Sequence, residues 1–239
     1  MDGLFIKGID IRWDEAEEDL GYVAGIRPLR NTDHLELKKN ITFFAGENGS
    51  GKSTLLEAIA IAAGLNAEGG TNNFRFSTYE DYSGLNRIVH LIRRGARPHS
   101  YFLRAESFYN VASAAMNQYN DDGRMTDLHA RSHGESFFDF IMENDSVGLY
   151  LMDEPEAALS PQRQLSLLLL LHRMAEEGSQ FIIATHSPIL LAEPEAEILS
   201  FDGGQIRPIR YEETESYRIT RMFMQDRQRM LKLLFEKDE

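Results

Sequence analysis

The chain has 239 residues, of which 42% are hydrophobic, a length and composition sufficient for one α/β domain with a real core. It contains no cysteine, which excludes disulfides and cysteine nucleophiles, and its net charge of −13 does not support DNA as a partner. No early run resembles a signal peptide, and the longest apolar run, Leu167–Leu171, is far shorter than the ~20 residues of a membrane span, so we expect a cytoplasmic protein.

The first forty residues contain one clear pattern. Residues 4–13 alternate apolar and polar side chains, which predicts a β-strand. Tyr22 lies 24 residues (46 − 22) before Gly46, where an aromatic ring could stack on adenine. A surface position on a strand is the simpler interpretation of Tyr22.

A glycine-rich segment between a short apolar run and a helical pattern predicts a phosphate-binding loop. Ile41–Phe44 is typical of a buried strand, residues 46–53 fit G-x-x-x-x-G-K-[ST], and residues 55–60 continue as a helix that Gly64 would end. In this context backbone N–H groups and the helix N-terminus bind phosphates of a nucleoside triphosphate, a lysine contacts the β/γ-phosphates and a serine hydroxyl ligates Mg²⁺. A plain glycine-rich turn is the weaker alternative. The predicted nucleotide-binding residues here are Gly46, Glu47, Asn48, Gly49, Ser50, Gly51, Lys52, Ser53 and Thr54.

The next segment is a polar loop followed by a basic stretch. Residues 66–84 are rich in Asn, Gly, Ser and Thr, which predicts irregular structure, and Asn86–Arg94 and Ser100–Glu106 predict two strands. Residues 87–104 contain no acidic residue, so they are either an anion-binding surface or a set of exposed, solubilising strand positions. The basic residues concerned are Arg87, Arg93, Arg94, Arg97 and Arg104.

Residues 107–145 have a helical pattern at each end and a loop pattern between. Asp127, His129 and His133 have no regular ligand spacing, which argues against a metal cluster. Ser132 and Glu135 fit the S-x-x-E capping box that begins a helix at about Phe137.

A second strand pattern ends in two carboxylates. Residues 147–152 are almost continuously apolar, as in a strand covered on both faces of a parallel sheet, and ligands collect at the carboxyl ends of such strands. On a strand, Asp153 and Glu154 would point to opposite sides and take different roles. Asp153 would hold Mg²⁺ through its water shell, and Glu154 would orient or deprotonate an attacking water. A polar strand end without chemistry is the alternative.

The remaining elements follow from capping and periodicity. Ser160 predicts the N-cap of a helix that ends before Gly178, and residues 181–185 predict a buried strand that brings His186 to the same sheet edge. There His186 could hydrogen-bond a γ-phosphate, or it could be structural. Residues 196–211 predict a hairpin, and residues 215–236 predict one amphipathic helix. Its apolar side would contain Met222, Phe223, Met230, Leu233 and Leu234.

The order of these motifs resembles that of the ATP-binding-cassette (ABC) ATPase superfamily, and Asp153–Pro161 resembles its stand-alone AAA/ABC-type ATPases of the RecF/SMC-like branch. The resemblance implies an α/β P-loop NTPase fold with a mostly parallel central sheet, an antiparallel β subdomain and a helical insertion at about 107–145. We expect one domain over residues 1–239. The 82 residues from Lys52 to Gly134 (134 − 52) fit a compact insertion and leave no room for SMC coiled-coil arms.

The resemblance also implies roles for single residues. Residues 46–54 would be Walker A, Asp153 would close Walker B, and Ala158–Ser160 would be the D-loop. Two features differ from the family pattern: His133 stands where the signature motif usually has glycine, and Glu106 stands where the Q-loop glutamine is expected. The implied catalytic residues are Lys52, Glu154 and His186; the implied metal ligands are Ser53, Asp153 and Glu106; and the implied signature contacts to ATP are Ser132, Gly134 and Glu135.

Taken with the motifs, the resemblance implies an ATPase that uses ATP and Mg²⁺. The family forms head-to-tail dimers that sandwich two ATP molecules, so we expect an ATP-dependent homodimer. We expect a soluble switch or motor, in DNA maintenance or defence, with an unidentified protein partner. The ATP-binding subunit of a membrane ABC transporter is the alternative, and a nucleotide-gated binding module with slow turnover is a third.

Overall fold

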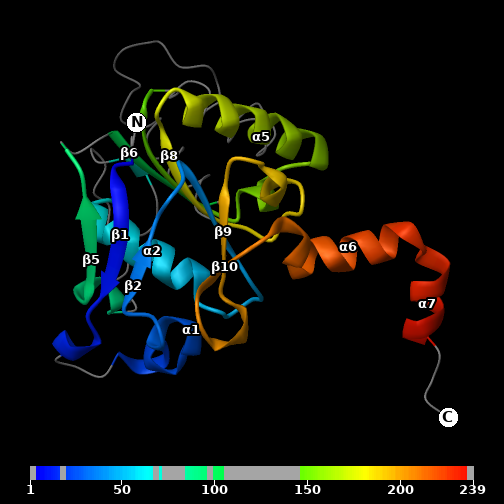
Figure 1. The fold of residues 1–239 in the computed structure, drawn as a ribbon, viewed down its shortest axis with the longest axis horizontal. Helices are drawn as coiled ribbons and strands as arrows, with labels where there is room; N and C mark the ends of the chain where they lie inside the picture. Colours follow the sequence, from blue (N-terminus) through cyan, green and yellow to red (C-terminus); the bar gives the residue numbers. More distant parts are fainter. Residues whose placement is uncertain are drawn as a thin grey trace, which may run out of the picture.

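The computed structural model describes residues 4–16, 20–66, 70–71, 84–95, 99–104 and 146–235, and the fold below refers to these residues. Two sheets form its framework, one central and mostly parallel, the other small and antiparallel (Figure 1). The α/β fold with a mostly parallel central sheet and an antiparallel β subdomain is confirmed. The expected helical insertion at 107–145 lies outside the described residues.

The central sheet has the strand order β10-β9-β3-β8-β7-β6-β4 within the described parts of the chain. Its five inner strands are parallel, and the two edge strands run antiparallel to their neighbours. Strand β8 lies between β3, which precedes the glycine-rich loop, and β7, which ends in the two carboxylates. The strands are β3 (Ile41–Ala45), β4 (Gly70–Thr71), β6 (His99–Arg104), β7 (Gly148–Asp153), β8 (Gln180–Ala184), β9 (Glu197–Ser200) and β10 (Arg207–Ile209).

The small sheet has the order β2-β1-β5 and is antiparallel, with β1 (Ile6–Ile11), β2 (His34–Glu36) and β5 (Val89–Arg93). The two strands predicted on either side of residues 95–98 therefore belong to different sheets, because β5 pairs with β1 and β6 pairs with β7. A buried glutamine joins the sheets: Gln180 accepts from the Ile6 N–H and donates to the Ile6 carbonyl, each over 2.8 Å.

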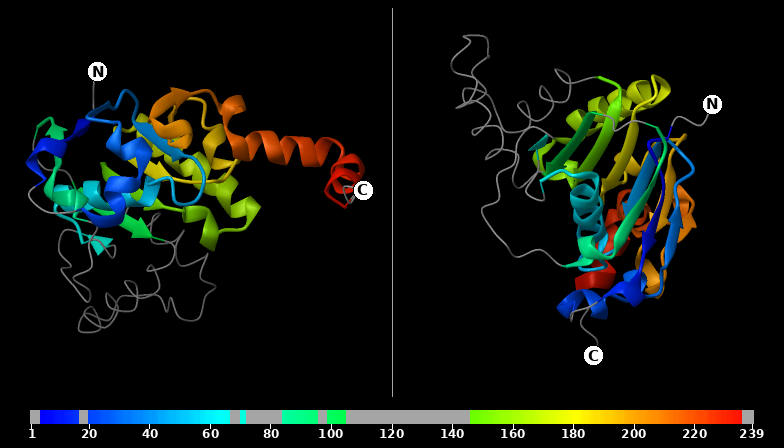
Figure 2. Two further views of the ribbon diagram at one scale, coloured as in Figure 1. Left: turned by 90° about the horizontal axis from the view of Figure 1, so that it is seen from below. Right: turned by 90° about the vertical axis from the view of Figure 1, so that its left-hand side faces the viewer.

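Helices cover both faces of the central sheet. Helix α2 (Lys52–Ala63) packs between the small sheet and one face of the central sheet, and α5 (Pro161–Glu176) covers the other face (Figures 1 and 2). Gly64 ends α2 in a left-handed conformation, and the Ser160 hydroxyl accepts from the Arg163 N–H at the start of α5, both as predicted. The other helices are α1 (Arg27–Arg30), α6 (Glu215–Gln225) and α7 (Arg227–Phe235).

Short 3-10 turns connect these elements. They are η1 (Trp13–Glu15), η2 (Gly21–Gly25), η3 (Leu85–Arg87), η5 (Pro155–Ala158), η6 (Leu190–Ala192), η7 (Asp202–Gly204) and η8 (Tyr211–Glu213).

Strands β3, β7 and β8 of the central sheet are buried on both faces, which explains why their sequences are almost continuously apolar. Successive residues alternate between two cores: Leu151 faces α2 and the small sheet, whereas Tyr150 faces α5. On the α5 side, the ring of Tyr150 stacks on those of Tyr101 and Phe181, at centroid distances of 4.9 and 5.0 Å. These two cores fix the carboxyl edge of the sheet, where the candidate site lies.

The C-terminal segment differs from its prediction. Strands β9 and β10 form the expected hairpin, but the expected single helix is two helices, because Asp226 leaves the helical conformation at φ −146° and ψ 74°. Its carboxylate accepts from the Arg229 N–H over 3.0 Å and so caps the start of α7. Helices α6 and α7 project from the body of the molecule (Figure 1), and neither contains a buried residue. We call α6 and α7 the C-terminal arm.

Candidate nucleotide-binding site

The glycine-rich loop joins β3 to α2 in a conformation that its glycines permit. Gly51 is the N-cap of α2 at φ +99°, and a Cβ atom there would lie 2.7 Å from Cγ2 of Ile26, so no larger residue fits. Asp202 of η7 accepts from the Glu47 N–H over 2.9 Å and holds the other end of the loop. The loop is therefore fixed both to the helix behind it and to the turn after β9.

Lys52 is the first residue of α2, and its side chain folds back over the loop. Its ammonium donates to the carbonyls of Gly46 and Glu47, each over 2.8 Å, and the residue is 4% exposed. Burial lowers the pKa of Lys52, and the nearby carboxylates of Glu154 and Asp202 oppose that shift. Within the described residues its hydrogen-bond partners are neutral, so a phosphate in the loop would add the anionic partner that a buried ammonium favours.

Ser53 and Asp153, the two predicted metal ligands that the structure describes, come together at the sheet edge. The Ser53 hydroxyl donates to Oδ1 of Asp153 over 2.8 Å, and Asp153 is buried at the carboxyl end of β7. A hydroxyl beside a carboxylate suits Mg²⁺, which prefers oxygen ligands and takes the rest from water and phosphate. The third predicted ligand, Glu106, lies outside the described residues.

Arg104 belongs to this site, although the sequence grouped it with the arginines of residues 87–104, predicted to be either an anion-binding surface or exposed, solubilising positions. It lies opposite Asp153 in the β6–β7 register, with Nε 3.4 Å from Oδ2 of Asp153. Its Nη1 lies 3.2 Å from Oε2 of Glu57, one helical turn after Ser53 in α2. Burial raises the pKa of Glu57, and Arg104 opposes that shift. Sequence reasoning missed this arrangement because cross-strand register is not visible in a local pattern.

The prediction that Glu154 is the last residue of a strand is wrong. It is a turn residue with φ +47° and ψ 52°. Among the described residues it is the one non-glycine residue with positive φ, a conformation that costs roughly 1–2 kcal/mol. The N–H of Glu154 donates to the Ala184 carbonyl over 2.9 Å, which holds the turn against β8. Its side chain is 44% exposed, in contrast to that of Asp153, so the two carboxylates do occupy different environments.

His186 follows β8 and lies beside Glu154, as the sequence predicted. Its Nε2 is 3.7 Å from Oε1 of Glu154, too long for a hydrogen bond, and this buried nitrogen has no hydrogen-bond partner among the described residues. The His186 backbone is held by Glu156, whose Oε1 accepts from the N–H groups of His186 and Ser187 over 2.6 and 3.1 Å. Sequence reasoning missed Glu156, although it stands in the Asp-Glu-Pro-Glu motif.

Two family models match the chain over the segments that build this edge. A model described as an AAA domain matches residues 22–111, and a second AAA-domain model, whose description names the AbiEii toxin of type IV toxin–antitoxin systems, matches residues 128–192. The first match contains the glycine-rich loop, and the second contains Asp153, Glu154 and His186. Both models describe AAA domains, so the segments that build this edge are similar to those of AAA-type P-loop ATPases. Such families generally bind and hydrolyse ATP.

Solved structures that resemble this chain include an ABC transporter and two SMC heads. An inward-facing metal-chelate-type ABC transporter has a TM-score of 0.46 and 18% identity, covering 80% of each chain. The SMC head domain from Thermotoga maritima has a TM-score of 0.43 and 17% identity, covering 74% of this chain and 92% of that one. An SMC head bound to the C-winged-helix domain of ScpA has a TM-score of 0.42, 15% identity and the same coverages.

Several predicted site residues are not part of this geometry. The signature residues Ser132, Gly134 and Glu135 lie outside the described residues. Tyr22, considered for adenine stacking, lies in the turn η2 rather than on a strand and is 67% exposed. In the described ranges, no helix is long and apolar enough to cross a membrane.

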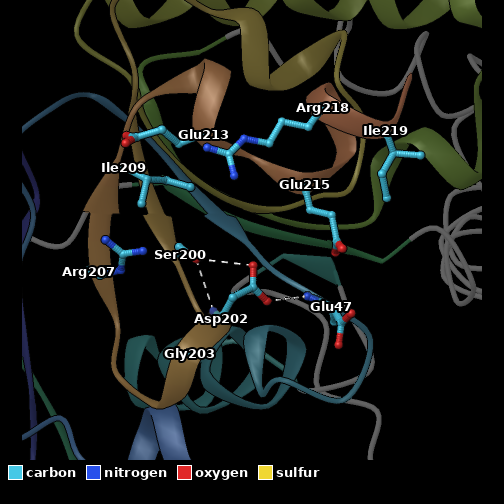
Figure 3. Close-up of a pocket in the computed structure, with 10 residues that line it drawn as sticks. All are labelled: Glu47, Ser200, Asp202, Gly203, Arg207, Ile209, Glu213, Glu215, Arg218 and Ile219. Atoms are coloured by element: carbon cyan, nitrogen blue, oxygen red, sulfur yellow. Dashed lines mark hydrogen bonds between the residues drawn. The ribbon is translucent and has the colours of Figure 1, made fainter. Parts of the chain in front are cut away.

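A cavity of about 510 Å³ adjoins the glycine-rich loop (Figure 3). Its wall includes Glu47 of the loop and Asp202 of η7, which are joined by the hydrogen bond described above. Side chains from β10, η8 and the start of the C-terminal arm complete the wall, and they include both acidic and basic residues. These are Arg207, Ile209, Glu213, Glu215, Arg218 and Ile219.

The residues present fit ATP with Mg²⁺. Besides the Ser53–Asp153 pair, three buried polar atoms have no hydrogen-bond partner in the described chain. Two of them can donate to a phosphate, Oγ of Ser50 in the loop and Nε2 of His186 at the sheet edge, and the third is Oε2 of Glu156, an acceptor. Buried polar atoms are normally hydrogen-bonded, so unpartnered ones at a phosphate loop are consistent with a ligand that completes them.

Proposed function

We propose that this chain hydrolyses ATP to ADP and phosphate with Mg²⁺ at the edge formed by the phosphate loop, β7 and β8. The observation that carries the proposal is the convergence of four side chains from two segments: Lys52 and Ser53 at the start of α2, and Asp153 and Glu154 at the end of β7, with Ser53 and Asp153 in direct contact. The loop N–H groups and Lys52 would bind the phosphates. Ser53 and Asp153 would hold Mg²⁺, which when bound neutralises phosphate charge during phosphoryl transfer.

Glu154 would act as the general base. The attacking water loses a proton to the Glu154 carboxylate as its oxygen bonds to the γ-phosphorus, and the bond from phosphorus to the ADP oxygen breaks. The turn at Glu154 supports this role, because it places the carboxylate outside β7 and beside His186. His186 would donate from its imidazole to the γ-phosphate.

Glu154→Gln tests the hydrolysis proposal. The amide keeps the size of the side chain but is a far poorer base, so the hydrolysis rate should fall about 10²- to 10⁴-fold while ATP binding remains. Phosphate release and binding of a fluorescent ATP analogue measure the two quantities. Glu177→Gln, an exposed carboxylate after α5, is the matched control. Hydrolysis at the wild-type rate in Glu154→Gln would show that this carboxylate is not the base.

We also propose that ATP joins two copies of the chain head to tail. The support is the S-x-G-E motif at 132–135 together with the partial exposure of Glu154 and His186, whose side chains are 44% and 36% exposed. In the dimer, Ser132, Gly134 and Glu135 of one copy would contact the ATP bound by the other. Glu154→Gln, which keeps ATP, should give a long-lived dimer in light scattering after size exclusion. A mutant that binds ATP yet stays monomeric at micromolar concentration would contradict the sandwich.

Within the cell we propose a soluble switch or motor that acts with a protein partner, in defence or DNA maintenance, rather than a transporter subunit. The AbiEii description of the second family model favours defence. Direct DNA binding has less support than the sequence suggested, because Arg104 pairs with two carboxylates and Arg93 donates to the Ala62 carbonyl. Duplex DNA at low salt should leave the hydrolysis rate unchanged, and strong stimulation would contradict this. Co-purification with membranes would favour the transporter alternative.

A further inference from the structure

Both oxygens of the Asp153 carboxylate have a polar neighbour in the protein. Oδ1 accepts from the Ser53 hydroxyl over 2.8 Å, and Oδ2 lies 3.4 Å from Nε of Arg104. The guanidinium is thus a cation at the carboxylate that the proposed function assigns to Mg²⁺. The contact is built into the fold, because Arg104 and Asp153 are register partners on adjacent parallel strands.

Arg104 has a second carboxylate within reach. Its Nη1 lies 3.2 Å from Oε2 of Glu57, while Nε faces Asp153, so one guanidinium bridges two carboxylates from different elements. The three side chains are largely shielded, with exposures of 26% for Arg104, 18% for Glu57 and 8% for Asp153. In such surroundings charges are less screened than on the surface, so the cation affects metal binding at Asp153.

We propose that Arg104 keeps free divalent cations off Asp153 until a nucleotide is bound, and that Glu57 retains the guanidinium when Mg²⁺ arrives with ATP. A free metal ion gains one carboxylate but meets a fixed positive charge beside it. A metal ion bound to ATP brings several negative phosphate charges that offset that repulsion. Arg104 therefore makes metal binding conditional on nucleotide binding, and Glu57 gives the guanidinium a partner that does not compete with the metal.

The inference rests on the proposed function only in assigning Asp153 to the metal. Its first test needs neither ATP nor hydrolysis. Mn²⁺ replaces Mg²⁺, and the loss of the free-ion signal in electron paramagnetic resonance reports binding to the nucleotide-free protein. Arg104→Gln should bind Mn²⁺ at least about tenfold more tightly than the wild type, as expected when one nearby positive charge is removed. Equal or weaker binding would overturn the inference.

Two further comparisons locate the effect. Adding Asp153→Asn to Arg104→Gln should abolish the gain in Mn²⁺ affinity, and a gain that persists would mean that the ion binds elsewhere. Arg12→Gln removes an exposed arginine paired with Glu15 and should leave Mn²⁺ affinity unchanged. An increase as large as that of Arg104→Gln would overturn the local explanation.

Arg104→Gln leaves two shielded carboxylates without their cation, so its folding is checked by thermal melting. If it unfolds, Glu57→Gln is compared with the double variant Arg104→Gln/Glu57→Gln. In the double variant only the Asp153 carboxylate loses its cation. The double variant should bind Mn²⁺ at least about tenfold more tightly than Glu57→Gln alone. Equal affinities would overturn the inference.

Removing the Glu57 carboxylate should weaken metal binding, whereas removing Arg104 should strengthen it. In Glu57→Gln the guanidinium keeps only Asp153 as a carboxylate partner among these three residues, so more Mg²⁺ should be needed to bind a fluorescent ATP analogue, by several-fold at half saturation. A lower or unchanged Mg²⁺ requirement would overturn this part. If the wild type binds no ATP, the proposed function fails, whereas the Mn²⁺ comparison still tests Arg104.

Discussion

The carboxyl edge of the central sheet and the C-terminal arm both contain many apolar side chains, but these are buried in the first region and not in the second. Every residue of β7 and β8 is buried, whereas no residue of α6 or α7 is. In the arm, Met224 and Phe235 are 77% and 75% exposed. An apolar pattern therefore predicts that a helix or strand forms, but burial requires a second surface that faces it.

The two regions differ in how much of the remaining chain packs against them. Strands β7 and β8 have α2 on one side and α5 on the other, so both faces are covered. The arm is attached through η8, where the Tyr211 hydroxyl donates to the Pro188 carbonyl over 2.8 Å and the Tyr211 ring lies 4.5 Å from the ring of Tyr217 in α6. We infer that the sheet edge carries function and most of the stability, and that the arm contributes little to either in the monomer.

The largest effect should come from Lys52→Ala at the sheet edge. Removing the ammonium removes the charge that would neutralise the phosphates, so hydrolysis should fall by at least about 10²-fold. Stability of the nucleotide-free protein should change by less than about 1 kcal/mol, because desolvation already disfavours this ammonium and alanine suits the first turn of a helix. Phosphate release and thermal melting measure the two. Lys38→Ala, at an exposed lysine, is the control; wild-type hydrolysis in folded Lys52→Ala would remove Lys52 from the site.

Some features of these two regions could be predicted from the sequence, and others could not. Walker A and the Ser53–Asp153 contact were predictable, because a strand–loop–helix motif and a strand ending in carboxylates each fix their own local geometry. The position of Arg104 depends on cross-strand register, and the turn at Glu154 depends on a hydrogen bond to β8. The break at Asp226 was missed because the apolar periodicity continues across it.

A second effect, on stability, should come from Glu156, which holds the His186 loop. Glu156→Ala removes an acceptor of two backbone N–H groups and should cost about 1.5–3 kcal/mol of unfolding free energy, as for hydrogen bonds to charged groups. Glu156→Gln keeps an oxygen there and should cost less. Urea unfolding measures both. If the two variants lose the same free energy, the carboxylate oxygen is not what holds the loop.

A pH effect should appear where α5 meets the segment after η6. Nδ1 of His172 lies 2.8 Å from Oε1 of the buried Glu193, and this hydrogen bond and charge raise the pKa of His172 above its ordinary 6.5. A raised folded-state pKa contributes stability below about pH 6.5 that is lost as pH rises through the folded-state value. The stability of the wild type relative to His172→Gln should therefore fall between pH 6 and pH 8.5 in urea unfolding. A difference that is constant or rises with pH would contradict the assignment.

The smallest effect should come from removing most of the arm. Deleting residues 220–239 keeps the buried Thr214 and the Tyr211–Tyr217 contact and removes only residues that are exposed or half-exposed where described. Loss of exposed residues changes stability by about 0.5 kcal/mol or less, so the melting temperature and hydrolysis rate should both stay near their wild-type values.

The stability lost in Leu171→Ala provides the reference for the stability lost in that deletion. Leu171 is fully buried in α5, and truncating one such leucine costs about 2–5 kcal/mol because it leaves a cavity in a core that relaxes only in part. Truncating this one side chain should therefore lower the stability more than removing the last two turns of α6 and all of α7. Thermal melting of both variants at several protein concentrations decides the comparison. If the deletion costs as much as Leu171→Ala, and more so at high concentration, the exposed side of the arm is covered in solution by another copy. The contrast between the two regions would then hold for the isolated chain alone.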